Sequence, residues 1–409
     1  MDQATTLPRT LERPVFGYWD RRALQAISNT LPFLEIRDAE KGGLEFIDPE
    51  GQLTAHVHAR KAGVFRRILC GGSLAGAETY VRGEWDCAEL TNLIRLFIRN
   101  NLTADRLDGW LSWLMNSGNR IVHALRRNSP QRSRVNIAAH YDLGTDFFRL
   151  WLDPTLSYSS GIFRSDSATL EDASREKMNH VCRKLRLAPA ERLLEIGCGW
   201  GALAVHAAEQ HGCRVTATTS SQDQAQVALQ RARQSQASNN IELLTTDYRQ
   251  LNGTFDRLVS IEMIEAVGHR YYDTFFRQCS QLLQRQGTML LQAIILPEQR
   301  FAAYRKSVDF IQRYIFPGGA LPSLGILLKS IGRVSDLRLV EVEDFTADYA
   351  RTLRYWKETF LARQEEVLQL GFSKEFLRLW TYYLCYCEAL FAERYASLLH
   401  LRLAKPAAD

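Results

Sequence analysis

The stretch that decides the fold reads Leu193-Leu194-Glu195-Ile196-Gly197-Cys198-Gly199-Trp200-Gly201-Ala202-Leu203-Ala204. A short apolar run ends next to an acid, three alternating glycines come after it, and an alanine-rich segment with helical spacing comes next. This order predicts a strand, a tight turn and a helix. The glycines let the backbone approach a ligand that a Cβ atom would hold away. The start of the helix would offer N–H groups that lack partners within the helix.

The spacing of the glycines indicates which ligand this turn suits. A dinucleotide-binding turn places its third glycine three residues after the second and an acid about 20 residues further on. Here Gly201 follows Gly199 by only two positions, and the next predicted strand ends in Thr218-Thr219-Ser220-Ser221, without a carboxylate. Hydroxyls at this place fit a ribose without a pyrophosphate. The pattern therefore argues against NAD and favours S-adenosylmethionine (SAM).

The composition is that of a globular protein with more than one domain. The chain has 409 residues, of which 46% are hydrophobic and 24% charged, which fits two or three domains. No apolar run reaches the roughly 18 residues that span a bilayer, and residues 1–13 do not resemble a secretory signal. The eight cysteines have no zinc or redox spacing. We therefore expect reduced thiols, no metal and a cytoplasmic location.

The net charge of +5 is modest but unevenly distributed. One short basic stretch comprises Arg120, Arg126, Arg127, Arg132 and Arg134. Anionic lipid headgroups and nucleic acid phosphates are both suitable partners for such a stretch. A solvated linker fits the same charges.

The chain divides into three parts by pattern. Residues 1–127 predict a small α+β domain, with strands at 31–37, 44–47 and 53–58, a hairpin turn at 48–51 and a helix at 65–70 that ends in a turn at 71–74. An amphipathic helix is expected at 107–125. Residues 128–135 are polar, basic and interrupted by Pro130, which predicts a linker. Residues 136–409 would then form the catalytic domain.

Strand and helix patterns alternate in the catalytic domain. Strands are expected at 193–196, 215–218, 241–245, 255–261 and 288–295, and helices at 170–187, 202–211, 222–235, 271–283 and 322–331. This order predicts an α/β fold, a doubly wound, Rossmann-like parallel sheet whose ligand lies at the carboxyl ends of the strands. The aromatic segment 296–320 would cover an apolar substrate, and residues 349–403 are expected to be helical.

Several separate motifs in residues 135–405 resemble the cyclopropane fatty acid synthases, SAM-dependent enzymes that act on unsaturated acyl chains. The resemblance rests on Ala139-His140-Tyr141-Asp142-Leu143-Gly144, Tyr158-Ser159, Glu195 to Gly201, Asp247-Tyr248-Arg249, Glu265 with Val267-Gly268, Tyr314 to Gly318 and Tyr382-Tyr383-Leu384. The N-terminal domain is similar to an extra domain of longer bacterial members that is thought to engage lipid.

The resemblance implies a role for each matching residue. Gly197, Gly199 and Gly201 would line the methionine end of SAM, with Glu195 at the strand end. Tyr158 and Ser159 would close over the cofactor. The remaining cofactor contacts would come from Thr219 and Gln224 near the ribose, and from Asp247 and Tyr248 at the adenine.

The family is also thought to bind a bicarbonate ion that acts as the base. Its partners would be Glu265, the backbone of Ile294 and Tyr383, together with the residues at two further positions, which are usually a cysteine and a histidine. This chain departs at both positions, because they are Ser160 and Gln292. Either replacement can hydrogen-bond an oxyanion, but neither titrates near pH 7. The departures bear on the steps after methyl transfer more than on the transfer itself.

The function that this implies is methylene addition across the double bond of unsaturated phospholipid acyl chains, giving cyclopropane fatty acids. The catalytic set would be Glu265, Tyr383, Ser160, Gln292 and Ile294, with Glu265 organising the base. His140 is a weaker alternative base. We also expect peripheral contact with an anionic inner membrane surface and a homodimer.

Three alternatives stay open. The same fold and cofactor could give a methyl-branched or methylene acyl product, an outcome that Ser160 and Gln292 motivate. A SAM-dependent RNA methylase would use the basic stretch, but no RNA-binding signature is visible and we expect no nucleic acid partner. A paralogue that binds lipid and SAM without transferring a methyl group is the third.

Overall fold

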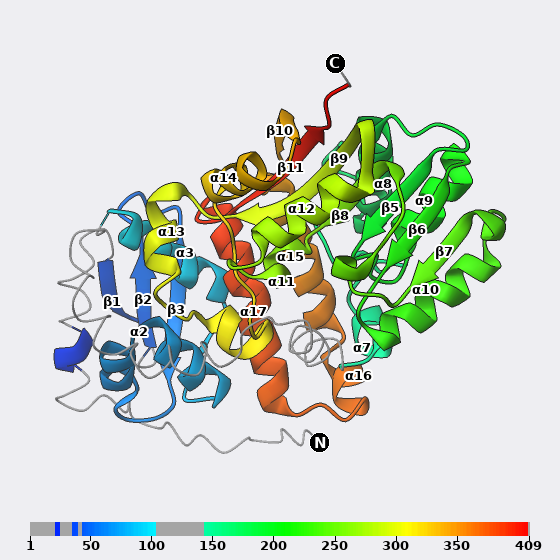
Figure 1. The fold of residues 1–409 in the computed structure, drawn as a ribbon. Helices are drawn as coiled ribbons and strands as arrows, with labels where there is room; N and C mark the ends of the chain where they lie inside the picture. The colour runs from blue at the N-terminus through cyan, green and yellow to red at the C-terminus, as the bar shows by residue number, and fades with distance from the viewer. Residues whose placement is uncertain (1–20, 25–34, 40–42, 104–142, 408–409) are drawn as a thin grey trace, which may run out of the picture. The chain divides into compact units, whose positions relative to one another are not determined.

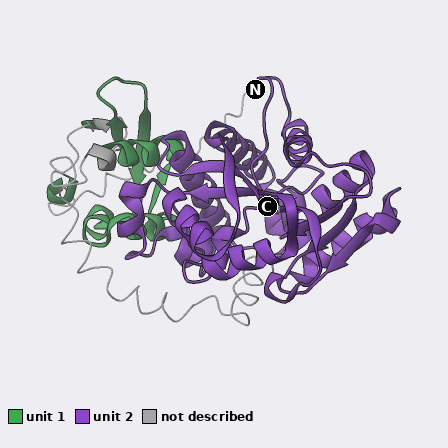
Figure 2. Ribbon diagram, turned by 45° about the horizontal axis from the view of Figure 1, so that its top comes forward, with its two compact units in different colours: residues 1–112 green, residues 113–409 purple. Residues whose placement is uncertain are grey.

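The computed structural model describes residues 21–24, 35–39, 43–103 and 143–407. The chain forms two compact units, residues 1–112 and 113–409 (Figure 2). The predicted helix at 107–125, the linker at 128–135, the basic stretch and His140 lie outside the described residues. The domain boundary at 127 therefore stays a prediction.

The first unit contains a four-stranded antiparallel sheet in the order β1-β2-β3-β4. Its elements are β1 Glu35–Ala39, β2 Gly43–Ile47, β3 Thr54–Ala59, α2 Val64–Val81, β4 Trp85–Cys87 and α3 Leu90–Thr103. The predicted hairpin turn lies between β2 and β3. Asp48 closes it, because its carboxylate accepts a hydrogen bond from Leu53 N at 3.0 Å and its carbonyl accepts one from Gly51 N. Arg99 of α3 also donates to this buried carboxylate.

The predicted turn at 71–74 is wrong, because α2 runs through it. The helix bends at Gly72, whose φ of 61° and ψ of −153° are not helical, and then continues. A glycine adopts such a conformation at little steric cost, so the chain changes direction without ending the helix.

The second unit is built on a seven-stranded sheet in the order β10-β11-β9-β8-β5-β6-β7, which Figure 1 shows running from the top of the view to the right. The strands are β5 Arg192–Ile196, β6 Arg214–Thr218, β7 Ile241–Leu244, β8 Phe255–Ile261, β9 Leu283–Ile295, β10 Arg338–Asp344 and β11 Ser397–Ala404. The strands from β9 to β7 are parallel, as predicted. The expectation that 349–403 is entirely helical is wrong, because β11 pairs antiparallel with both β9 and β10.

The second unit also contains helices, some of which cover the faces of this sheet. They are α7 Thr145–Arg149, α8 Leu170–Leu185, α9 Ala202–His211, α10 Gln222–Gln234, α11 Ile264–Val267, α12 Tyr272–Leu282, α13 Glu298–Tyr304, α14 Leu324–Val334, α15 Thr346–Ala362, α16 Gln364–Gln369 and α17 Lys374–Ala392. Short turns add η2 Ser238–Asn240, η3 Tyr248–Gln250 and the π-helical η4 Ile311–Ile315. No helix in the described part of the chain is both long and apolar enough to cross a membrane.

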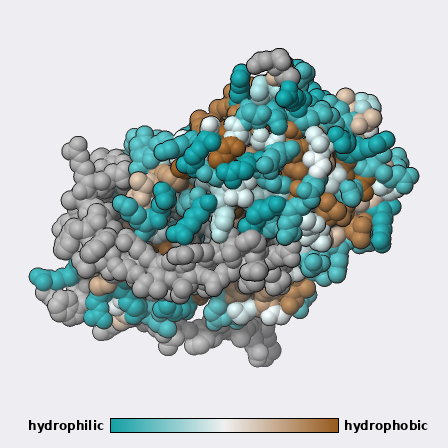
Figure 3. Space-filling model, viewed as in Figure 1, coloured by the Kyte–Doolittle hydropathy of each residue, from teal (hydrophilic) through white to brown (hydrophobic). Residues whose placement is uncertain are grey.

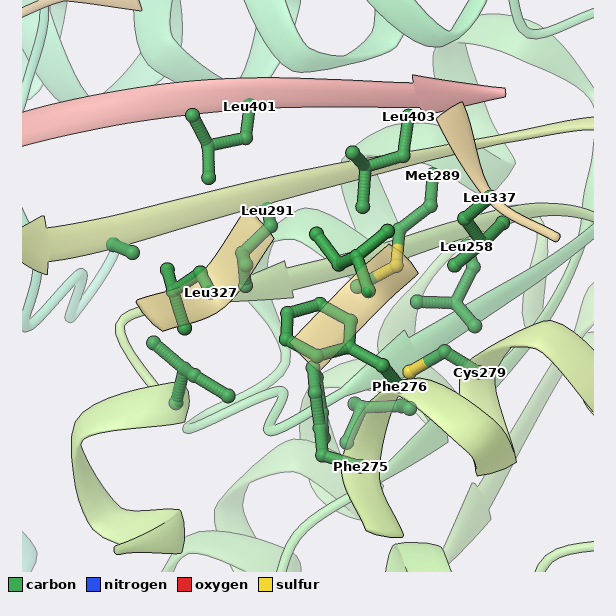
Figure 4. Close-up of a cluster of buried hydrophobic side chains, with 14 of the residues drawn as sticks. Leu258, Phe275, Phe276, Cys279, Met289, Leu291, Leu327, Leu337, Leu401 and Leu403 are labelled. Atoms are coloured by element: carbon green, nitrogen blue, oxygen red, sulfur yellow. The ribbon is translucent and has the colours of Figure 1, made fainter. Parts of the chain in front are cut away.

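The sheet buries a different set of side chains on each face, because successive residues of a strand point to opposite sides. On one face, Leu291 of β9 and Leu401 of β11 pack against Phe275 and Phe276 of α12 and Leu327 of α14 (Figure 4). Each side chain of this size contributes about 1.5–3 kcal/mol when it is fully buried.

The opposite face is covered by α8 and α9. Leu193 of β5, Val259 of β8 and Leu290 of β9 pack there against Val181 and Leu203 of these helices. In contrast to these buried layers, the described part of the surface in Figure 3 is mostly hydrophilic, with hydrophobic residues interspersed. The predicted fold class is therefore confirmed. Two strands, β11 and β10, are added at one edge, and β11 is antiparallel to both of its neighbours.

The order of the strands marks where a ligand would bind. From β5 the chain proceeds outward to β6 and β7, then returns to the other side of β5 as β8 and β9. Such a reversal leaves a crevice between the carboxyl ends of the two strands that diverge, here β5 and β8. The predicted site residues cluster at these ends.

Candidate active site

The glycine turn after β5 has the backbone that its sequence predicts. Gly197, Gly199 and Gly201 have φ values of 89°, 53° and 80°. A Cβ at Gly201 would lie 3.0 Å from the Cβ of Ala228 in α10, whereas a Cβ at Gly199 would meet no atom of the described chain within 4 Å. Gly201 is therefore required for helix packing, and Gly199 leaves open space.

A cavity of about 180 Å³ lies next to this turn. The predicted cofactor residues line it, from Tyr158 and Ser159 through Glu195 and Gly199 to Tyr248, with the single exception of Gly201. Thr219 donates a hydrogen bond to Gln224 at 2.9 Å, so the hydroxyl and amide expected near a ribose lie side by side. The Asp247 carboxylate binds the guanidinium of Arg249 in a bidentate pair.

Glu195 is 3% exposed, and one of its carboxylate oxygens, Oε2, has no hydrogen-bond partner among the described residues. Burial raises the pKa of Glu195 to about 8, against the opposing charge of Lys177. A buried carboxylate oxygen without a donor is costly. Glu195 lines the cavity, so a cationic ligand there would supply the missing partner. A glycine cradle and an unpartnered acid both fit SAM, which carries an ammonium and a sulfonium group.

Lys177 of α8 also lines the cavity, although it is absent from the predicted site residues. Its Nζ donates to the hydroxyl of Ser159 at 2.6 Å, and it is 3% exposed. Burial lowers the pKa of Lys177, while the carboxylates of Glu262, Asp153 and Glu195 oppose this. Helical spacing could have revealed it, because Lys177 is four residues from Ala173 and from Val181, both on the buried face of α8.

Two carboxylates lie just beyond the end of β8. The first, Glu262, lines the cavity and accepts hydrogen bonds from Ser160 N at 3.0 Å, Gln292 Nε2 at 2.7 Å and the Tyr349 hydroxyl at 2.6 Å. Burial raises the pKa of Glu262, and its hydrogen bonds and Lys177 oppose the rise.

Glu265, one turn further along, is held differently. It accepts one hydrogen bond from Ile294 N at 2.5 Å, and its Oε2 has no partner within the described ranges. Burial, and next the charge of Glu262, raise the pKa of Glu265 to about 8. Two neighbouring acids whose surroundings differ in this way can take different protonation states near neutral pH.

The predicted bicarbonate partners are brought close together, with one exception. Ser160, Gln292 and Ile294 surround the two carboxylates, but their donors are engaged with protein groups. Ser160 Oγ donates to Gly161 O, while its N–H and the Gln292 amide donate to Glu262. The arrangement does not fit a bound bicarbonate beside an intact Glu262, so we derive no step through that ion.

Tyr383 is the exception. Its hydroxyl lies 2.7 Å from the hydroxyl of Tyr158, and the tyrosine that donates to Glu262 is Tyr349 of α15. Tyr349 is absent from the predicted site residues. It is separated from Glu262 by 87 positions, and no local pattern indicates that the two would meet.

Aromatic rings surround Tyr158. Its ring centroid lies 5.3 Å from that of Phe148, 5.4 Å from those of Trp151 and Trp356, and 6.4 Å from that of Phe316. Phe316 belongs to the segment 296–320, so this segment approaches Tyr158, and its role as a cover over the substrate stays a prediction. This side of the site is apolar and aromatic, which suits a hydrocarbon substrate.

Comparison with known proteins agrees with this geometry. The family model of mycolic acid cyclopropane synthetase matches residues 128–401. The chain is 34% identical over 83% of its length to the tuberculostearic acid methyltransferase UfaA1 of Mycobacterium tuberculosis, covering 81% of that protein. It is 35% identical over 84% of its length to the cyclopropane-fatty-acyl-phospholipid synthase of Escherichia coli strain K12, covering 86% of it.

Comparison with solved structures indicates the same family. The crystal structure of the mycolic acid cyclopropane synthase CmaA1 complexed with SAH and CTAB matches with a TM-score of 0.63 and 33% identity, over 66% of this chain and 98% of that one. The chain therefore belongs to the mycolic acid cyclopropane synthetase family and is a SAM-dependent methyltransferase of the cyclopropane synthase type.

Proposed function

We propose that this enzyme adds a methylene group across the double bond of unsaturated phospholipid acyl chains. The observation that carries the proposal is the position of Glu262. Its half-buried carboxylate lines the same cavity as the glycine turn, and Tyr158 on this cavity is enclosed by aromatic rings. An acid, a cofactor cradle and an apolar wall therefore meet at one place.

We propose the following roles for residues around the cofactor. SAM supplies an electrophilic methyl group, which an alkene carbon accepts as the bond to sulfur breaks and its electron pair stays on sulfur. Glu195 would bind the cationic end of the cofactor, while Gly199 leaves room for close approach. Thr219 and Gln224 would hold the ribose hydroxyls. Binding both reactants in one cleft lowers the entropic part of the barrier.

The aromatic rings around Tyr158 would protect and stabilise the cation that methyl transfer leaves on the second alkene carbon. Water would trap that cation, so the site has to exclude it. Phe148 and Trp151 are buried, and their rings pack against Tyr158 at the cavity. Aromatic faces also attract positive charge, as does an ionised carboxylate nearby.

The position of the base decides the product. Removal of a proton from the transferred methyl group closes a cyclopropane ring, and removal from a neighbouring chain carbon leaves a methyl-branched alkene. A carboxylate on the cavity is the group that can accept either proton. The two reactions need the same cofactor and the same cation.

A methyl-branched product is therefore the second candidate. Two observations favour it: Ser160 and Gln292 depart from the usual cysteine and histidine, and one relative at 34% identity is named a tuberculostearic acid methyltransferase. In either case we propose peripheral binding to anionic membranes through basic side chains. Salt should weaken binding to anionic vesicles, and binding that ignores both salt and lipid charge would contradict this. A homodimer, which light scattering would test, rests on the resemblance alone.

The function is tested with purified protein, labelled SAM and vesicles of monounsaturated phospholipid, and the acyl chains are then analysed by mass spectrometry. A gain of one CH₂ that resists hydrogenation identifies a cyclopropane. A gain that hydrogenation converts to a branched saturated chain identifies the second candidate. Turnover of RNA, or SAM binding without turnover of any unsaturated lipid, would overturn both.

A further inference from the structure

Glu262 accepts hydrogen bonds from three donors in three parts of the chain. They are the N–H of Ser160, the side-chain amide of Gln292 on β9 and the hydroxyl of Tyr349 on α15, at 2.6–3.0 Å. The first two donate to Oε1, and the third donates to Oε2. Donors directed at both oxygens stabilise the charged form of a carboxylate.

A hydrogen bond with His400 fixes the orientation of the Gln292 amide. Its Oε1 lies 2.8 Å from Nε2 of His400 on β11, the residue with which it is paired in register. An amide oxygen can only accept, so this nitrogen of His400 carries the proton and the Gln292 NH₂ group faces Glu262. His400 is 2% exposed, and burial holds its pKa well below the usual range, which keeps it neutral.

The backbone of Glu262 also indicates a functional position. Its φ of 46° lies in the left-handed region, where a non-glycine side chain is disfavoured. Strain of this kind persists where the surroundings determine the conformation, and it gathers at functional sites. A glutamate therefore has a backbone conformation here that a glycine would adopt more easily.

Glu262 faces the reaction space. It lines the cavity together with Lys177 and Tyr158, and Glu265 is not among the described residues that line it. Within the described part of the chain, the titratable groups that interact with Glu262 are Lys177 of α8, Tyr349 of α15 and Glu265 of α11. Its surroundings thus provide both the donors and the access that a catalytic anion requires.

We propose that the Glu262 carboxylate is the resident anion and base of this site, so that the reaction needs no bicarbonate. Ser160 and Gln292, which the family resemblance assigns to that ion, hold this side chain in its place. The inference rests on the proposed function and deepens it by naming the group that takes the proton.

The step is a single proton transfer after methyl transfer. A C–H bond of the transferred methyl group breaks, its proton moves to a Glu262 oxygen, and its electron pair forms the ring bond to the cationic carbon. For the branched product, the C–H bond that breaks belongs to the neighbouring chain carbon and its electron pair forms the alkene. Glu262 then releases the proton to solvent, and no oxidant or second cofactor is required.

The test is Glu262→Gly, measured in buffers purged of carbon dioxide and again with added bicarbonate. The wild-type enzyme should turn over at the same rate in both. The variant should lose at least 100-fold in kcat without bicarbonate and recover at least tenfold when it is added, because the three donors then face a small anion. Full turnover of Glu262→Gly in purged buffer, or a wild-type rate that bicarbonate raises severalfold, would overturn the proposal.

Glu262→Gln is the matched variant, because it keeps the size of the side chain and removes its basicity. Its kcat should fall equally, bicarbonate should not restore it, and the SAM dissociation constant should stay within about threefold of wild type. Recovery of Glu262→Gln by bicarbonate would contradict the idea that the side chain occupies the place of the ion.

A binding measurement separates this inference from the proposed function. ¹³C-labelled bicarbonate should bind Glu262→Gly and not the wild-type protein, as seen by NMR in the absence of lipid. If the wild type modifies no unsaturated lipid, the proposed function fails while this result still tests the place of Glu262. Equal bicarbonate binding to both proteins would overturn the inference even if the enzyme makes cyclopropanes.

Discussion

Replacing Tyr349 with phenylalanine removes one hydroxyl group, the donor to Glu262 Oε2 at 2.6 Å. Burial and the charge of Glu262 raise the pKa of Tyr349 well above its usual range, so it donates at every accessible pH. A hydrogen bond to a charged group contributes about 1.5–3 kcal/mol. Because about 1.4 kcal/mol corresponds to one pKa unit, its loss should raise the pKa of Glu262 by about one to two.

The assay is kcat against pH with saturating SAM and unsaturated vesicles. Glu262 accepts a proton only when ionised, so the acid limb of the profile reports its ionisation. Loss of a donor to the ionised form raises the pKa, and the acid limb of Tyr349→Phe should move to higher pH by about one to two. The charge of Lys177, which also lowers the pKa of Glu262, is retained in this variant.

Tyr383→Phe is the matched control, since its hydroxyl contacts that of Tyr158 and is not one of the three donors to Glu262. It should leave the acid limb in place. An acid limb that stays unchanged in Tyr349→Phe, or moves equally in both variants, would refute the assignment of Tyr349 to the carboxylate. A change of the acid limb in Tyr383→Phe alone would instead support the role that the family resemblance gives to Tyr383.

Three further predictions concern the cofactor side. Gly201→Ala should destabilise the protein by about 2 kcal/mol or more in urea unfolding, because its Cβ would lie 3.0 Å from that of Ala228 and its φ is 80°. Glu195 has a pKa of about 8 when folded, so the folded state keeps a proton that the unfolded chain releases and stability falls as pH rises towards 8. Glu195→Gln should flatten that fall between pH 5 and 8 in urea unfolding, and an unchanged slope would contradict it. Lys177→Met removes the donor to Ser159, which is expected to close over the cofactor, and should weaken SAM binding at least tenfold by calorimetry. An unaltered affinity would contradict the idea that Lys177 positions Ser159 for cofactor binding.

The sequence predicts the parts of the site that are local in the chain. The glycine turn, the strand before it and the helix after it are encoded by consecutive residues, and the structure has them as expected. Ser160, Gln292 and Glu265 are also identifiable from the sequence, because each lies in or beside a recognisable motif. Their roles are not predictable in the same way, since the partner of each donor lies on another element.

The residues and elements that the sequence does not predict are missed for physical reasons. Tyr349 and His400 act at a distance of 87 and 108 positions from Glu262 and Gln292, so no spacing rule connects them. Leu399 to Leu403 of β11 alternate apolar and polar residues, a strand signal that the helical expectation for 349–403 missed. The turn predicted near Gly72 is correct as a break in regularity and wrong as the end of a helix.

The position of β11 has a consequence for how the protein is made. This strand comes after β10 by more than fifty residues of helix and turn, yet it inserts between β10 and β9. While the ribosome is still making α17, β9 has an open edge that β11 will later occupy. His400 arrives with the same strand, so the Gln292 amide is oriented only when residue 400 has emerged. Assembly of the site around Glu262 therefore has to wait for β11, and chains interrupted before this strand would present an unpaired strand edge to chaperones and proteases.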